Sequence, residues 1–150
     1  MNPLQEPVGI AFREKIAWLS LVSMIVAYSV YFVLATTAMQ HGATTLRLIG
    51  YLAAVLVIQA IVTAAASIAI ALASGAEARA AADERDRAIA RRGAAAAYFV
   101  LMVGMISVGC VMPFKDRGWT IINAALFALL VAEVVRYGII VASYRKGWHA

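Results

Sequence analysis

The stretch SGAEARAAADERDRAIARRG, from Ser74 to Gly93, is the only long polar segment of this chain, and it separates two similar apolar halves. It carries five arginines against four acidic residues: Arg79, Arg85, Arg87, Arg91 and Arg92 against Glu77, Asp83, Glu84 and Asp86. Alanine is abundant in it, and Ser74-Gly75-Ala76-Glu77 fits the capping box that satisfies free amides at a helix start. Asp83 and Arg87 stand four residues apart with the acid first, the favourable order for a helical ion pair. The sequence therefore predicts a helical connector over residues 74–93 that can continue into the next apolar run.

Both halves have the composition of membrane-spanning segments. The 150-residue chain is 64% hydrophobic and 14% charged, whereas about 25% of the residues in ordinary soluble domains are charged. About 20 apolar residues in a helix cross the hydrocarbon core of a bilayer. We predict four spans, at about residues 16–38, 47–73, 94–112 and 120–144. The expected fold is a single domain, 1–150, with an all-α, four-helix membrane bundle built from two helical hairpins.

Lysine and arginine are unequally distributed between the two sides of these spans. One side has Arg13, Lys15, the five connector arginines, Arg145 and Lys146; the other has Arg47, Lys115 and Arg117. Because cytoplasmic flanks carry the excess of basic residues, this ratio of nine to three predicts that both termini and the connector are cytoplasmic. The N-terminus lacks the features of a cleavable signal peptide, so we expect the first span to be retained.

Two ionisable residues interrupt the fourth predicted span. Glu133 falls near the middle of the bilayer, and Arg136 lies one turn toward the cytoplasm on the same face, close enough for an ion pair. Gln59 lies at a comparable depth in the second span, which predicts a contact between Gln59 and Glu133. Since ionisable groups in hydrocarbon are costly unless they are paired, we interpret the three residues as an intramembrane polar network. The alternative is the proton site of a small transporter, and the single intramembrane acid with an arginine beside it weighs against that alternative.

The motifs and residue clusters that enzymes use are missing from the sequence. The two histidines, His41 and His149, fall on opposite sides of the membrane, which excludes haem ligation between spans of one chain. The single cysteine, Cys110, allows neither an intrachain disulfide nor a CxxC redox pair. The sequence has no metal-ligand cluster, nucleophile motif or phosphate loop. We expect a non-enzymatic protein without cofactor, metal or catalytic residues, and without direct binding of nucleic acid, because apolar runs interrupt its basic residues.

The second half of the chain, residues 83–147, resembles a family of small bacterial membrane proteins that cross the bilayer four times. The resemblance rests on Asp83-Glu84-Arg85-Asp86-Arg87 with Ile89, Arg92-Gly93 and Tyr98, and on the ending from Arg136-Tyr137 through Tyr144-Arg145-Lys146-Gly147. No biochemical activity is established for this family. The gene of a small helix-turn-helix DNA-binding protein often lies beside those of its members, which implies a membrane partner that could sequester or regulate a transcription factor.

The leading expectation is a non-enzymatic, multi-pass regulator or anchor in the inner membrane that binds a small cytoplasmic protein, such as a helix-turn-helix transcription regulator. The contacts would come from Arg85, Asp86, Arg87, Arg91 and Arg92. The alternatives are a small homodimeric proton-coupled transporter centred on Glu133 and a structural subunit of a larger complex. A further alternative is that the connector only joins the two hairpins. Small residues such as Ala64 and Gly104 allow close helix packing, either within one chain or across a homodimer.

Overall fold

Four long helices make up most of the chain. The computed structural model describes residues 12–75, 79, 83–115 and 118–146. Helix α1 spans Phe12–Gln40, α2 spans Thr45–Ser74, α4 spans Glu84–Ile106 and α5 spans Trp119–Arg145. Predictions that involve Glu77, Arg117, Gly147 and His149 lie outside the described residues. Each long helix is sufficiently long and apolar to cross a membrane, so the predicted all-α, four-helix membrane bundle of a multi-pass protein is confirmed.

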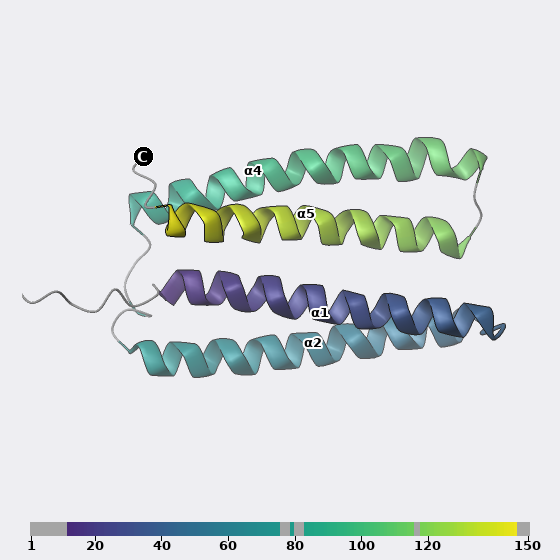
Figure 1. The fold of residues 1–150 in the computed structure, drawn as a ribbon, viewed down its shortest axis with the longest axis horizontal. Coiled ribbons are helices and arrows are strands. Elements are labelled where there is room, and N and C mark those ends of the chain that lie inside the picture. Colours follow the sequence, from purple (N-terminus) through teal and green to yellow (C-terminus); the bar gives the residue numbers. More distant parts are fainter. Residues whose placement is uncertain (1–11, 76–78, 80–82, 116–117, 147–150) are drawn as a thin grey trace, which may run out of the picture.

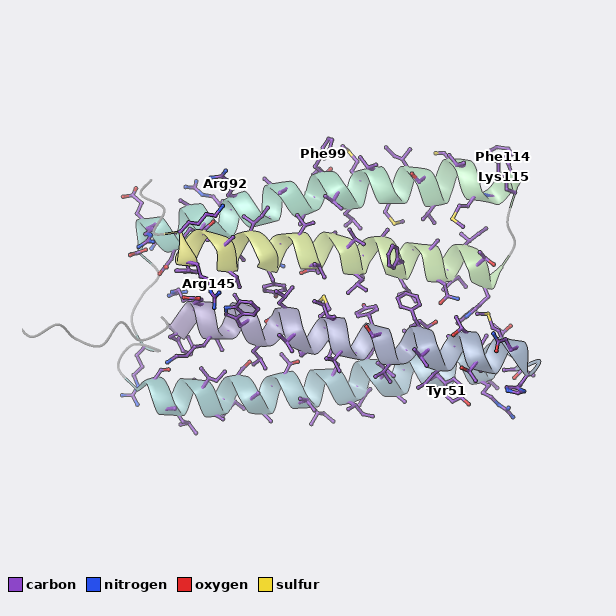
Figure 2. All side chains as sticks on the ribbon, in the orientation of Figure 1. Tyr51, Arg92, Phe99, Phe114, Lys115 and Arg145 are labelled. Atoms are coloured by element: carbon purple, nitrogen blue, oxygen red, sulfur yellow. The ribbon has the colours of Figure 1, made fainter. Side chains whose placement is uncertain are left out.

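The helices pack as two antiparallel hairpins, α1 with α2 and α4 with α5 (Figure 1). The hairpins meet through α1 and α5, so α2 and α4 take the two outer positions. One end of the bundle, which we call the arginine-rich end, holds the start of α1, the end of α2, the start of α4 and the end of α5. Figure 2 shows Arg92 and Arg145 at this end and Lys115 at the opposite end, in agreement with the predicted distribution of basic residues. Phe99 points outward from the middle of α4, as expected for a side chain that contacts lipid (Figure 2).

The connector differs from its prediction. Ser74 is the last residue of α2, and Gly75 follows it with a φ of +49°, a backbone conformation that glycine adopts readily, so Ser74 does not begin a helix. The capping box lies instead at the start of α4, where the Asp86 amide donates a hydrogen bond to Oδ1 of Asp83 at 2.7 Å. Asp83 uses its carboxylate for this cap, and among the described residues it forms no ion pair with Arg87. As predicted, α4 then continues without interruption into the third span.

The turn between α4 and α5 follows from Pro113. One π-helical turn, Ser107–Val111, and one 3-10 turn, Met112–Phe114, close the third span. Proline has no amide hydrogen and its ring crowds the preceding turn, so a regular α-helix cannot continue through it. Gly118 then adopts a φ of +53° at the start of α5, which allows the chain to reverse direction within a few residues.

Small residues bring α4 and α5 into close contact. A β-carbon placed on Gly104 would lie 2.7 Å from the Cβ atom of Ala128, and one placed on Gly93 would lie 3.0 Å from the main-chain oxygen of Arg136. Because apolar side chains gain little by leaving lipid for each other, packing of this kind is a main source of helix association in membranes. The two glycines therefore set the distance between α4 and α5.

Toward the end of the bundle opposite the arginine-rich end, a buried tyrosine connects the two hairpins. Tyr31 of α1 is fully buried and packs with Ala35 and Leu48. Its hydroxyl donates a hydrogen bond to Oδ1 of Asn123 in α5 at 2.8 Å. The side-chain Nδ2 of Asn123 in turn donates to the main-chain oxygen of Trp119 at 3.1 Å. Sequence reasoning missed this pair, because a tyrosine and an asparagine in different spans carry no signal that they meet.

Candidate functional site

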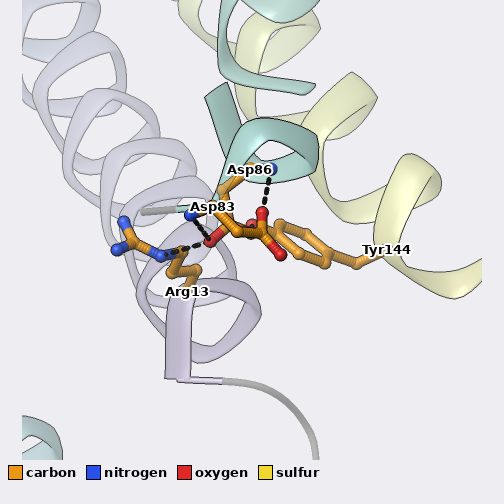
Figure 3. A network of polar contacts seen from close by, with 4 residues as sticks. All are labelled: Arg13, Asp83, Asp86 and Tyr144. Atoms are coloured by element: carbon orange, nitrogen blue, oxygen red, sulfur yellow. Dashed lines mark hydrogen bonds and ion pairs between the residues drawn. The ribbon is translucent and has the colours of Figure 1, made fainter. Parts of the chain in front are cut away.

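Three helices meet at the side chain of Asp86 at the arginine-rich end (Figure 3). Nε of Arg13, from α1, lies 2.8 Å from Oδ2 of Asp86, and the hydroxyl of Tyr144, from α5, donates a hydrogen bond to Oδ1 at 2.6 Å. Hydrogen bonds to a carboxylate are stronger than those between neutral groups. We call Arg13, Asp83, Asp86 and Tyr144 the Asp86 cluster; it connects α4 to both α1 and α5.

The local sequence explains why Asp86 occupies this position. Asp83 caps α4, and the residue three positions later in a capping box turns its side chain back toward the cap. The Asp83 amide donates to Oδ2 of Asp86 at 3.4 Å, a long bond that leaves this oxygen available to Arg13. The first turn of a helix also favours negative charge, because its free amides point out of the helix end. The carboxylate is therefore held at the helix start before the other helices contact it.

A second contact joins α1 and α5 nearby. Glu14 is only 8% exposed, and its Oε1 lies 3.7 Å from Nε of Arg145. The guanidinium group of Arg145 also lies over the ring of Trp18, 5.2 Å from its centroid. Since the Arg145 side chain is 64% exposed, water weakens the ion pair, and the contact with the indole ring adds to it.

The five residues predicted to bind a partner fall into two groups. Asp86 is engaged inside the molecule, and Arg85 is half-buried, with an Nε atom that has no hydrogen-bond partner in the described part of the chain. Arg87, Arg91 and Arg92 are exposed, and we call these three residues the α4 basic surface. Arg87 and Arg91, with Glu84 and Ala90, line a shallow hollow of about 550 Å³. Arg92 lines a second hollow, together with Lys146 and residues of α5.

The net charge of the α4 basic surface differs from the nearly balanced charge counted along the connector sequence. Asp83 caps the helix, and Asp86 and Glu14 form ion pairs with arginines of other helices. After Asp83, the described part of the connector contains two acidic residues, Glu84 and Asp86. Of these two, Glu84 is exposed. Over residues 83–93, four arginines stand against three acids, and the ion pair of Asp86 with Arg13 of α1 leaves this surface with an excess of positive charge.

The predicted intramembrane network is confirmed in one part and wrong in another. Glu133 and Arg136 form the expected ion pair, with Oε2 and Nη1 3.5 Å apart. Gln59 does not reach Glu133, because α1 lies between α2 and α5 (Figure 1). Gln59 lines a groove between α1 and α2, which Ser23 also lines. An equal depth in the membrane does not make two residues neighbours unless their helices are adjacent and turned toward each other.

The site provides positive charge and hydrogen-bond donors for binding. Comparison with protein-family models, curated proteins and solved structures finds no match for this chain. The resemblance of residues 83–147 to a bacterial family therefore stays a prediction. The Asp86 cluster and the α4 basic surface are the structural basis for assigning a function.

Proposed function

We propose that this protein is a non-enzymatic membrane anchor or regulator that binds a small acidic protein on the α4 basic surface. The observation that carries the proposal is the state of Arg87 and Arg91. Both are exposed, and neither side chain forms a hydrogen bond or ion pair with any residue within the described ranges. Planar guanidinium groups bind carboxylates through paired hydrogen bonds, so an acidic surface is the complementary partner.

The Asp86 cluster supports this proposal because it holds the arginines in place. The start of α4 contacts α1 through Arg13 and α5 through Tyr144, so the first turns of α4 cannot move independently of the bundle. Binding groups on a rigid helix lose less conformational entropy than groups on a loop. The cluster thus gives Asp86 a role as a positioning residue, in place of the direct contact predicted for it.

The partner belongs to the cytoplasm if the arginine-rich end faces it, as the excess of basic residues favours in an inner-membrane protein. A small helix-turn-helix regulator is the partner that the family resemblance implies. Such a protein would dock through an acidic surface, since its DNA-binding face is basic. Docking through the opposite face would keep the regulator at the membrane.

Changing both Arg87 and Arg91 to Glu is expected to weaken binding of this partner at least about tenfold, because each change replaces an attraction with a repulsion. A photoreactive residue at Ala90, in the same hollow, would first identify the contacting protein in cells. That protein would then be purified and titrated against the full-length chain in nanodiscs. The matched control changes Arg47 and Lys115, at the opposite end, to Glu. Unchanged affinity in the Arg87/Arg91 variant would place the docking surface elsewhere.

The alternative of a proton-coupled transporter centred on Glu133 has weaker support, because its carboxylate already lies beside Arg136. Transport would require Glu133 to exchange protons with both sides of the membrane. We expect vesicles that contain the wild-type protein to take up protons no faster than vesicles with Glu133→Gln under an imposed pH gradient. Uptake that depends on Glu133 would establish the transporter and overturn the anchor as the main function.

A further inference from the structure

A cavity of about 380 Å³ lies among α1, α4 and α5 at the arginine-rich end. Its volume is within the range of sites that bind small ligands. The charged residues of its lining are Arg13, Asp86, Arg87 and Arg136, three cations and one anion. We propose that this cavity binds one anionic phospholipid from the membrane leaflet at the arginine-rich end. This inference goes beyond the proposed function, because it assigns a different class of ligand to a cavity that shares only Arg87 and Ala90 with the hollow of the α4 basic surface.

The positive charge available in the cavity comes from Arg87 and Arg136. Arg13 and Asp86 form an ion pair with each other, so their charges largely cancel. Arg87 has no ion-pair partner among the described residues, and Arg136 is paired only with Glu133, at 3.5 Å. The charged residues of the lining together with Glu133 are three cations and two anions. Basic pockets between transmembrane helices are suited to bind anionic lipid head groups.

One nitrogen atom of Arg136 also lacks a hydrogen-bond acceptor, although Nη1 donates to Glu133. Its Nε atom is buried and has no partner in the part of the chain that the structure describes. A buried donor without an acceptor is destabilising, and most such donors in proteins are satisfied. Phosphate oxygens bind guanidinium groups through paired hydrogen bonds, and a turn of the Arg136 side chain, which is 43% exposed, would present Nε to a lipid phosphate.

The depth of the cavity indicates a lipid ligand. Arg136 precedes Arg145, the last residue of α5, by nine positions, which corresponds to a rise of about 13 Å along the helix. That distance is close to half of the ~30 Å hydrocarbon core. The Arg136 end of the cavity is out of reach of a soluble protein, whereas a phospholipid of the same leaflet extends to it from the outer end, which Asp86 and Arg87 line. Long arginine side chains extend toward the interface, which brings the Arg136 guanidinium closer to the head groups.

The apolar part of the lining fits an acyl chain. Ile16 of α1, Ile89 of α4 and Ile140 of α5 contribute aliphatic side chains from three directions, and Phe12 and Tyr137 contribute rings. Inorganic phosphate would leave these surfaces uncovered, whereas a phospholipid would cover them and bind the arginines together. The combination of both kinds of surface in one cavity is the reason to choose a lipid over a free anion.

Thermal unfolding of the full-length protein in a neutral detergent tests this proposal. Added phosphatidylglycerol is expected to raise the Tm by about 5 °C when present well above its Kd, and phosphatidylcholine or inorganic phosphate by less than about 1 °C. Arg136→Gln should remove the shift. Ile16→Trp fills the cavity and keeps every charge, so it should also remove the shift in Tm. This variant decides the result if Arg136→Gln does not fold. Arg91→Gln, an arginine of the same surface helix that does not line the cavity, should retain it.

The lipid site would be overturned if phosphatidylglycerol raised the Tm of both Arg136→Gln and Ile16→Trp as much as that of the wild type. It would also be overturned if phosphatidylcholine, or inorganic phosphate alone, raised the Tm of the wild-type protein as much as phosphatidylglycerol does. The same variants separate this site from the docking surface. Arg91→Glu should weaken partner binding and keep the response to lipid, and Arg136→Gln should do the reverse.

Discussion

Asp86→Ala is expected to lower the free energy of unfolding by about 3 kcal/mol, through loss of the bond from Tyr144, the ion pair with Arg13 and half of the capping box. Tyr144 and the cap account for most of this loss, because the Arg13 side chain is 39% exposed and water screens its attraction to the carboxylate. For a chain of this size the change corresponds to a decrease in Tm of roughly 6–12 °C. Thermal unfolding of the detergent-purified protein measures it.

Glu84→Ala is the matched control for this variant. Glu84 is exposed in the same first turn of α4, so the substitution removes one acid and leaves the contacts between helices intact. We expect a change within about 0.5 kcal/mol. Tyr144→Phe removes one hydrogen bond to the carboxylate and should lie between the two variants. If Asp86→Ala were no less stable than Glu84→Ala, the cluster would not hold the helices together.

Gly104→Leu is expected to push α4 away from α5 and to lower the free energy of unfolding by about 3 kcal/mol or more. Even one added carbon at this position would lie 2.7 Å from the Cβ atom of Ala128, closer than such atoms approach each other. The larger side chain would open a gap along the contact between the helices of the second hairpin. Helix contacts in membranes depend on close packing, so the loss cannot be recovered by hydrophobic burial elsewhere. The free energy is again measured by unfolding in detergent.

A compensating pair of substitutions tests the cause. Gly104→Ala should destabilise the protein, and adding Ala128→Gly should restore much of the loss because it removes the atom that clashes. Gly138→Ala is the control within the same hairpin, since nothing lies within 4 Å of the added carbon. It should be neutral or stabilising by up to about 1 kcal/mol, as expected for glycine to alanine within a helix. A Gly104→Ala variant as stable as Gly138→Ala would show that the packing tolerates the added atom.

The charge of the α4 basic surface could not be predicted by counting charged residues along the sequence. Residues 74–93 contain nearly equal numbers of arginines and acids, and the spacing of Asp83 and Arg87 predicts an ion pair within this helix. In the folded protein Asp83 bonds to a main-chain amide, and Asp86 pairs with Arg13, which is 73 positions earlier in the chain. Asp86 is thus used inside the molecule, and the exposed charged side chains of α4 are three arginines and Glu84. A surface of this kind is better suited to an acidic partner than the sequence alone indicated.

The sequence by itself determined the four spans and their approximate limits. It also determined the side of the bundle on which the basic residues collect. These features depend on the length of apolar runs and on charges at their ends, which are local properties of the chain. The ion pair between Glu133 and Arg136 could be predicted for the same reason, because both residues belong to one helix. The contacts of Asp86, the pairing of Tyr31 with Asn123 and the separation of Gln59 from Glu133 were decided only by the tertiary structure. Apolar spans of similar composition can pack in several orders and rotations, and the close approach of α4 to α5 and of α1 to α5 selects which polar side chains meet.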